Sequence, residues 1–268
     1  MSKEEQKLIL DSILEIYPPE AYSPEITSAE FRILQESNDK GEIEVTHVAK
    51  VIKVFLSYSA IDKRLVSKIK RWLEDYGLEV FLAHEDITPS AEWQKTILQN
   101  LESCNVFIPI FTKNFKDSDW TDQEIGIALA KKKFIIPLSI DIIPYGFLNK
   151  LQSLKLGSKS IYLSCEEIIK ILKDNSKFER PLLNSVIKTF LNSENFEEAK
   201  NKSRILLKFD DAFTAEQVNE IIRGSTQNNQ IYGSFGAQHA LRELIQKHNK
   251  GVDKNLTRKL YEKFDHRF

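Results

Sequence analysis

The sequence predicts an α/β protein built on a five-stranded parallel sheet with helices on both faces. Short apolar runs rich in β-branched and aromatic residues recur along the chain, as expected for buried strands, at Val51–Leu56, Leu78–Leu82, Val106–Phe111, Phe134–Ile140 and Ser160–Leu163. Helical patterns separate most of these runs. Strands that alternate with helices at this spacing are typical of a parallel sheet.

The signals that begin and end helices support this alternation. Asp62 is predicted to cap a helix after the first strand, and Gly77 provides its stop. A polar loop at 83–90 then leads into a second helix. Glu166–Lys173 is predicted as the helix that completes the outer layer.

Two prolines fall inside the proposed strands, where proline removes a donor from the ladder of backbone hydrogen bonds. Pro109 lies in the third run and Pro137 in the fourth. Each of these strands is therefore expected either to lie at a local edge of the sheet or to carry a bulge at its proline.

Three regions are predicted along the chain: a partly helical N-terminal extension (1–50), the α/β domain (51–175) and a mainly helical C-terminal domain (176–268). In the third region the strand signals fade and apolar stripes at helical spacing replace them. Thr214–Gln217 fits a capping box, which opens a helix that Gly224 is predicted to end.

Charge and composition exclude several classes of function. The 268 residues include 38 Lys and Arg against 39 Asp and Glu, so a formal net charge of -1 gives no electrostatic reason to expect nucleic acid or an anionic membrane as a partner. Cys104 and Cys165 lack a CxxC spacing and are expected as reduced thiols. Without a signal peptide or an apolar run of about 18 residues, the chain is expected in the cytoplasm.

Common catalytic and cofactor motifs are missing from the sequence. It contains no GxSxG, GxxxxGK[ST] or GxGxxG pattern, which sets aside serine hydrolase, P-loop and dinucleotide-fingerprint chemistry. His84 has no second histidine at a ligand-like spacing, so no metal site is expected.

The stretch Ser118–Ala130, read SDWTDQEIGIALA, holds the strongest candidate for chemistry. If a helix begins here after a strand, Trp120 and Glu124 lie close together at the mouth of the sheet, where open α/β folds bind ligands. The spacing also fits a capping box, in which Thr121 and Glu124 satisfy backbone donors at the start of the helix. On spacing alone, both interpretations stay open.

The chain from Val54 to about Lys155 resembles the TIR (Toll/interleukin-1 receptor) domain, particularly its prokaryotic branch. Six pieces match in the order of the family: VFLSYSAID, VFLAHEDITPSAEW, CNVFIPIF, SDWTDQEIGIALA, FIIPLSI and PYGF. The resemblance implies a flavodoxin-like sheet. It also places Pro89–Ser90 in the loop called BB, where the family often has Pro-Gly.

TIR domains of this type are known as enzymes that break the bond between nicotinamide and ribose in NAD+, releasing nicotinamide with ADP-ribose or a cyclised form. The family's pattern of tryptophan, three residues and glutamate falls on Trp120 and Glu124, which implies that Glu124 is catalytic. NAD+ is then the substrate, and no bound cofactor is expected. The resemblance further implies that the nucleotide pocket is bordered by Ser57, Tyr58, Phe81, Glu85, Asp86 and Trp120.

The resemblance also implies partners. TIR enzymes commonly complete the active site with the BB loop of a neighbouring protomer, so self-association through TIR domains is expected to switch activity on. A role in bacterial antiphage defence or signalling is expected, with the C-terminal domain binding a trigger or partner protein. The alternative is a TIR scaffold without turnover, which mediates homotypic protein–protein interaction.

Overall fold

The computed structural model describes residues 51–82, 93–118, 120–156 and 161–265. The predicted N-terminal extension and the polar loop at 83–90 lie outside these ranges. Residues 49–268 form one compact unit. No helix in the described ranges is long and apolar enough to cross a membrane.

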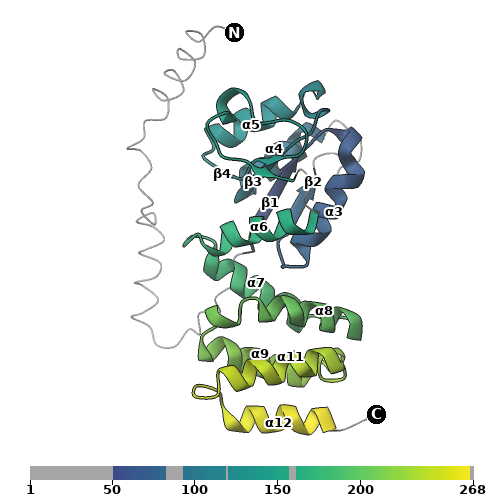
Figure 1. The fold of residues 1–268 in the computed structure, drawn as a ribbon, viewed down its shortest axis with the longest axis vertical. Coiled ribbons are helices and arrows are strands. Elements are labelled where there is room, and N and C mark those ends of the chain that lie inside the picture. The colour runs from purple at the N-terminus through teal and green to yellow at the C-terminus, as the bar shows by residue number, and fades with distance from the viewer. Residues whose placement is uncertain (1–50, 83–92, 119, 157–160, 266–268) are drawn as a thin grey trace. The chain divides into compact units, whose positions relative to one another are not determined.

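A parallel sheet forms the first half of this unit (Figure 1). Its strands are β1 (Lys53–Ser57), β2 (Glu79–Leu82), β3 (Val106–Phe111), β4 (Phe134–Ile135), β5 (Leu138–Ser139) and β6 (Leu154–Lys155). The strand order is β2-β1-β3-β5-β6, and β4 pairs with β3 ahead of β5. Since β4 and β5 are two parts of one predicted run, the five-stranded parallel sheet is confirmed.

The interruption between β4 and β5 lies where the two strand prolines meet. β3 pairs with β4 before Pro109 and with β5 after it, in unchanged register. That register sets Pro109 beside Pro137, but the backbone oxygen of Pro137 accepts from Leu154 N of β6, so the donor that Pro137 lacks would face the β6 side and not Pro109. β3 is paired with β1 on its other side. The prediction of a bulge is wrong, because the register is unchanged. A local edge fits Pro137, because the pairing of β5 with β6 begins only at Leu138 and Leu154, but it does not fit Pro109, which lies between paired strands.

The prediction of a strand at Ser160–Leu163 is wrong. The described part of that run begins helix α6 (Ile161–Lys173), and the last strand is instead β6, which pairs with β5. Apolar residues recur along this segment at helical spacing, at Cys165, Ile168, Ile169 and Leu172. A helix places them on one face, which is buried against the core.

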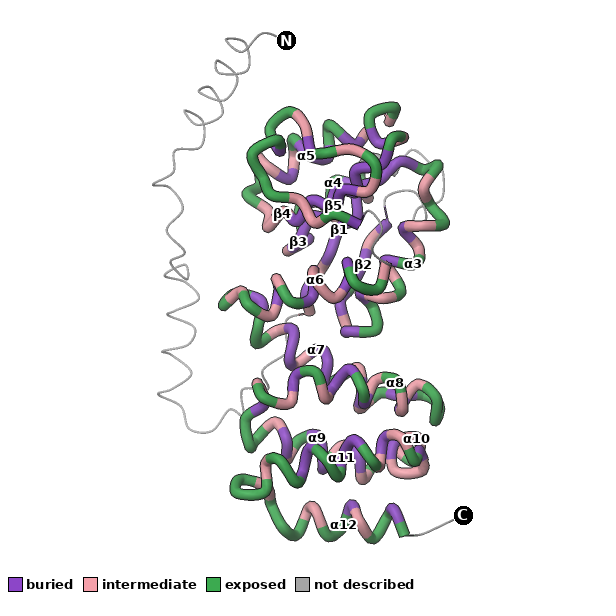
Figure 2. The backbone as a smooth tube through the Cα atoms, viewed as in Figure 1, coloured by how far each residue is buried: buried purple, intermediate pink, exposed green. Residues whose placement is uncertain are grey.

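Helices cover both faces of the sheet. α3 (Lys63–Glu74) and α6 pack on the face that carries Val54 and Leu56. α4 (Trp93–Ser103) and α5 (Thr121–Ala130) pack on the face that carries Phe55. Each face has its own apolar core because alternate strand residues point to opposite sides. Figure 2 shows the buried residues following the strands and the inward sides of the helices.

A helical region follows the sheet and continues the core on the α3 side. Its helices are α7 (Glu179–Leu191), α8 (Phe196–Leu207), α9 (Ala215–Gln227), α10 (Asn229–Tyr232), α11 (Phe235–Lys247) and α12 (Lys254–Asp265). The ring of Phe178 lies 5.2 Å from that of Phe134, and Phe178 shares a buried cluster with Leu260 of α12. Side chains from both sides of the predicted boundary near residue 175 thus pack in one core. The boundary between two domains stays a prediction.

The sequence predicts where the helix after Thr214 begins and where it ends, and only the first prediction is confirmed. The capping box at Thr214–Gln217 is confirmed, since both of its reciprocal hydrogen bonds are formed at the start of α9. The predicted end at Gly224 is wrong, because α9 continues to Gln227. A Cβ atom at Gly224 would approach Leu191 Cδ1 of α7 to 2.6 Å, so this glycine permits close helix packing instead.

Gly77 follows the end of α3 in the left-handed conformation, with φ of 78°. A Cβ atom there would lie 2.7 Å from the backbone oxygen of Ser185 in α7. We expect Gly77→Ala to lower the free energy of unfolding by about 3 kcal/mol, because the left-handed backbone and the overpacking each cost about 1–2 kcal/mol. Urea unfolding followed by circular dichroism measures this loss.

Gly146 provides the matched control. Its φ is also positive, at 58°, but a Cβ atom there would meet nothing within 4 Å. Gly146→Ala should therefore lower the free energy of unfolding by about 1 kcal/mol, the cost of the left-handed backbone alone. Equal losses in the two variants would contradict the close packing of Gly77 on α7.

Candidate functional site

A buried pair of polar side chains, Ser57 and Glu124, marks one end of the sheet. Ser57 is the last residue of β1, and Glu124 lies in the first turn of α5, the helix that follows β3. β1 and β3 are parallel, so the segments that follow them leave the sheet at the same end. Open α/β folds bind ligands at that carboxyl end of the strands.

A hydrogen bond from Ser57 holds Glu124. Ser57 Oγ donates to Glu124 Oε2 over 2.6 Å, and Glu124 is only 2% exposed. The second oxygen, Oε1, is also buried and has no hydrogen-bond partner among the described residues. Burial raises the pKa of Glu124 to about 7, and the bond from Ser57 limits the rise. The carboxyl group therefore changes its charge near neutral pH.

Glu124 lies on the buried stripe of α5, where apolar residues are expected. The buried residues of this helix recur at helical spacing, at Thr121, Glu124, Ile125 and Ala128. A carboxyl group on such a stripe is costly, because ionisation away from water is penalised. Because Glu124 lies on this stripe, its side chain faces the sheet. A costly buried carboxyl group at this end of the sheet is a candidate for function.

The capping-box interpretation of Glu124 is wrong. Trp120, rather than Thr121, occupies the N-cap position of α5. Thr121 Oγ1 donates to the backbone oxygens of Phe115 and Ser118, at 2.9 and 3.2 Å. These bonds hold the preceding turn against the start of α5. The Glu124 carboxyl group accepts from Ser57 instead of from backbone donors of its own helix.

Two of the predicted pocket residues lie on opposite faces of the sheet. Tyr58, next to Ser57, is fully buried in the core on the α3 side. Phe81 in β2 is half-buried and packs on the α5 side, with its ring centroid 5.2 Å from that of Phe55. Phe81 therefore shares a face with α5, the helix that carries Glu124.

The remaining predicted pocket residues are Trp120, Glu85 and Asp86. Trp120 is half-buried at the N-cap position of α5, four residues before Glu124. Glu85 and Asp86 lie outside the described residues, as does His84, so their part in a pocket stays a prediction. Within the ranges that are described, no three His, Cys, Asp or Glu side chains gather in a way that could hold a metal ion.

A second polar cluster at the same end of the sheet was missed by sequence reasoning. Asp62 stands at the N-cap of α3 as predicted, but its side chain makes no capping bond. It accepts hydrogen bonds from Thr112 Oγ1 at 2.5 Å and from Asn114 Nδ2 at 2.9 Å. Thr112 follows β3 directly, so the cluster joins the segments after β1 and β3. A polar residue directly after a buried strand is the signal that points to Thr112.

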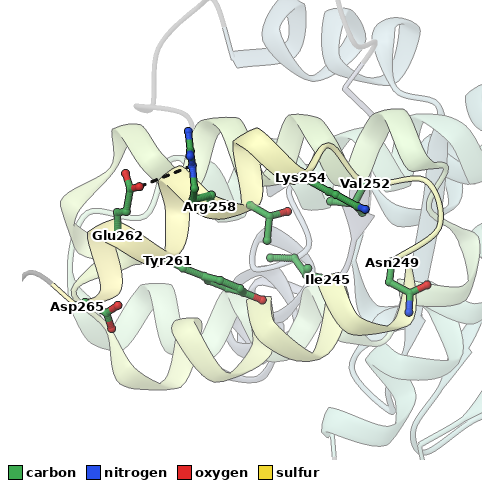
Figure 3. Close-up of a pocket in the computed structure, with 9 residues that line it drawn as sticks. Ile245, Asn249, Val252, Lys254, Arg258, Tyr261, Glu262 and Asp265 are labelled. Carbon is green, nitrogen blue, oxygen red and sulfur yellow. Dashed lines mark ion pairs between the residues drawn. The ribbon is translucent and has the colours of Figure 1, made fainter.

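The described residues also form a cavity of about 550 Å³ that is lined by α11, α12 and the connection between them (Figure 3). Tyr261 contributes to its wall, and Arg258 Nε lies 3.8 Å from Glu262 Oε1 beside it. Neither Ser57 nor Glu124 lines this cavity. This cavity is therefore not part of the candidate site. The evidence for that site is the buried carboxyl group of Glu124.

Comparisons with known proteins match part of the chain. A family model described as "TIR domain" matches residues 54–168. A protein of Brachypodium distachyon described as "Probable 2' cyclic ADP-D-ribose synthase BdTIR" is 29% identical over 94 residues. This match covers 34% of the present chain and 42% of that protein, so the chain spans less than half the length of this curated relative.

Two solved structures are similar in part. The TIR domain of the Toll-related receptor TRR-2 from Hydra magnipapillata is 21% identical, with a TM-score of 0.35, over 49% of this chain and 94% of that one. The Clostridium botulinum CMP N-glycosidase BcmB is 22% identical, with a TM-score of 0.32, over 44% of this chain and 98% of that one. At these scores neither structure bears on the chemistry of the site.

The raised pKa of Glu124 makes the stability of the fold depend on pH. The folded protein holds this proton up to a pH of about 7, whereas an unfolded glutamate releases it near its ordinary value of 4.5. The free energy of unfolding therefore falls as pH rises between these values, by about 3 kcal/mol in total. Glu124→Gln removes this loss, so we expect the variant to be more stable than the wild type above pH 7 and similar to it below pH 4.5.

Thermal unfolding of both proteins across this pH range measures the difference. The amide has nearly the same shape as the carboxyl group and still offers an oxygen to Ser57. A variant that melts at or below the temperature of the wild type above pH 7 would show that Glu124 ionises without the expected penalty.

Proposed function

Because residues 54–168 form a TIR domain, we propose that this protein cleaves the bond between nicotinamide and ribose in NAD+, releasing nicotinamide with ADP-ribose or cyclic ADP-ribose. The observation that carries the proposal is the buried Glu124 carboxyl group, held by Ser57 at the carboxyl end of β1. The name of the Brachypodium relative, a cyclic ADP-ribose synthase, supports the same class of reaction.

In the proposed reaction Glu124 stabilises positive charge. When the bond breaks, its electron pair goes to the nicotinamide nitrogen and neutralises the pyridinium ring, while the ribose becomes an oxocarbenium-like cation. A buried carboxylate stabilises such a cation more strongly than one in water, because little water screens the charge. Nicotinamide leaves without taking up a proton, so one carboxylate suffices and no general acid is required.

The hydrogen-bond pattern of the pair suits this role. Ser57 occupies Glu124 Oε2 and thereby fixes the orientation of the carboxyl group. The buried Oε1 remains available within the described structure to accept from a ribose hydroxyl. Water then attacks the ribose carbon and releases a proton, which gives ADP-ribose. Attack by a group of the same molecule gives a cyclic product, and water exclusion by Trp120 favours it.

We further propose that self-association through the TIR domain completes the site with the BB loop of a neighbouring protomer. In this proposal the helical region binds a trigger or partner protein, and bacterial antiphage defence is the setting. These points rest on the family resemblance alone.

Glu124→Gln is expected to reduce nicotinamide release from NAD+ by at least about 100-fold, because a neutral amide does not stabilise the ribosyl cation. Chromatography of the products formed by purified, assembled protein measures the loss. Asp122→Asn is the matched control. Asp122 lies in the same turn of α5, is exposed and accepts a hydrogen bond from Tyr145.

The control variant should release nicotinamide at close to the rate of the wild type. If Glu124→Gln and wild-type protein are equally active, the catalytic assignment of Glu124 fails. If the wild type itself releases no nicotinamide in its assembled state, the scaffold function is favoured instead.

A further inference from the structure

A cavity of about 480 Å³ lies where α3 and α6 of the sheet region meet α8 of the helical region. We call it the junction cavity, and its lining includes Trp72, Asp75, Tyr162, Lys202, Arg204 and Lys208. Its volume falls within the range of small-molecule sites, about 300–1,000 Å³. Neither Ser57 nor Glu124 lines it, so it is separate from the candidate site.

Two aromatic rings form one wall of the junction cavity. The ring centroids of Trp72 in α3 and Tyr162 in α6 lie 4.8 Å apart. Their planes are inclined by 57°, and Lys208 Nζ lies 5.3 Å from the centroid of the Tyr162 ring. Tyr162 is 37% exposed and Trp72 is half-buried, so each side chain keeps an accessible part. Exposed aromatic rings are stacking surfaces for planar bases, because ring and base gain dispersion contacts and bury apolar area together.

Ion pairs already neutralise part of the charge beside the cavity. Lys208 Nζ lies 2.7 Å from Glu166 Oε1 and donates to the hydroxyl group of Tyr76 at 2.9 Å. This contact joins α6 to the end of α8. Lys202 Nζ lies 3.0 Å from Glu198 Oε1 within α8. Each pair has a net charge close to zero. The net charge around the cavity therefore depends on the other charged side chains.

The remaining charged residues of the junction cavity, Arg204 and Asp75, balance each other, and a surplus of positive charge arises only together with a smaller neighbouring cavity. Arg204 forms no ion pair or side-chain hydrogen bond with any described residue. The same holds for Lys68 and Arg71, which line a smaller cavity of about 240 Å³ that shares Trp72 and Asp75 with the junction cavity. Asp75 opposes these cations, and burial raises the pKa of its carboxyl group. The surplus favours an anionic ligand around Trp72.

We propose that the junction cavity and the smaller cavity beside it together bind a nucleotide, with the base against Trp72 or Tyr162 and the phosphates between Arg71 of the smaller cavity and Arg204 of the junction cavity. Guanidinium groups bind phosphate oxygens through two parallel hydrogen bonds, so arginines suit this ligand. A nucleotide held in this way contacts α3, α6 and α8 together and stabilises their packing by mass action. This binding is independent of NAD+ cleavage at Glu124.

Calorimetric titration of ADP into the full chain carrying Glu124→Gln tests the proposal in the absence of turnover. We expect saturable binding with a dissociation constant of about 10–100 μM. Adenosine and inorganic pyrophosphate are each expected to bind at least about tenfold more weakly, because each keeps only the base or only the phosphate contacts. Added salt should weaken ADP binding, since the cations are exposed.

Variants of the cavity locate the binding. Arg71→Ala, Arg204→Ala and Tyr162→Ala should each weaken ADP binding about tenfold by removing one phosphate contact or part of the stacking surface. Arg223→Ala is the matched control, because Arg223 is an exposed arginine of α9 outside the cavity, and it should bind ADP as the parent does.

Two results would overturn the proposal: no saturation of the parent by about 10 mM ADP, or equal ADP affinity in the parent and in the variants at Arg71, Arg204 and Tyr162. Both are distinguishable from failure of the proposed NAD+ cleavage, because that reaction is measured as nicotinamide release by protein with an intact Glu124.

Discussion

The burial of one carboxyl group, that of Glu124, is the constraint on which the candidate site depends. The fold sets this group on the apolar stripe of α5 and gives it a single donor among the described residues, the hydroxyl group of Ser57. Ionisation in such a place costs free energy, which the apolar cores on the two faces of the sheet must offset. The same burial that costs stability strengthens the electrostatic effect of the carboxylate on a cation.

The centre of the sheet supplies the rigidity that this arrangement needs. β1 and β3 pair along their length, up to Ser57 beside Pro109, and nearly all of their residues are buried. The donor that Pro109 lacks would face β4 and β5, on the side of β3 away from β1, so the pairing that positions Ser57 is intact. Asp62 and Thr112 join the segments after the two strands, which restricts both.

The parts of the fold that could be predicted from the sequence are those with a local pattern. β1, β2 and β3 are apolar runs, and the capping box of α9 is a four-residue signal. β6 has two residues, too few to form a pattern. Glu124 was identified as a candidate, but its partner was not. Ser57 lies 67 residues away in sequence, and only the packed fold decides between it and the backbone donors of α5.

The pH dependence of kcat/KM for nicotinamide release tests most directly whether Glu124 acts as a buried carboxylate. For the wild type, kcat/KM should rise with pH through about 7 and then level off, because only the anionic form stabilises the cation. Ser57→Ala removes the bond that lowers the pKa of Glu124, so the rise should move to higher pH. A wild-type profile that is flat across this range, or a rise that Ser57→Ala leaves in place, would contradict that role.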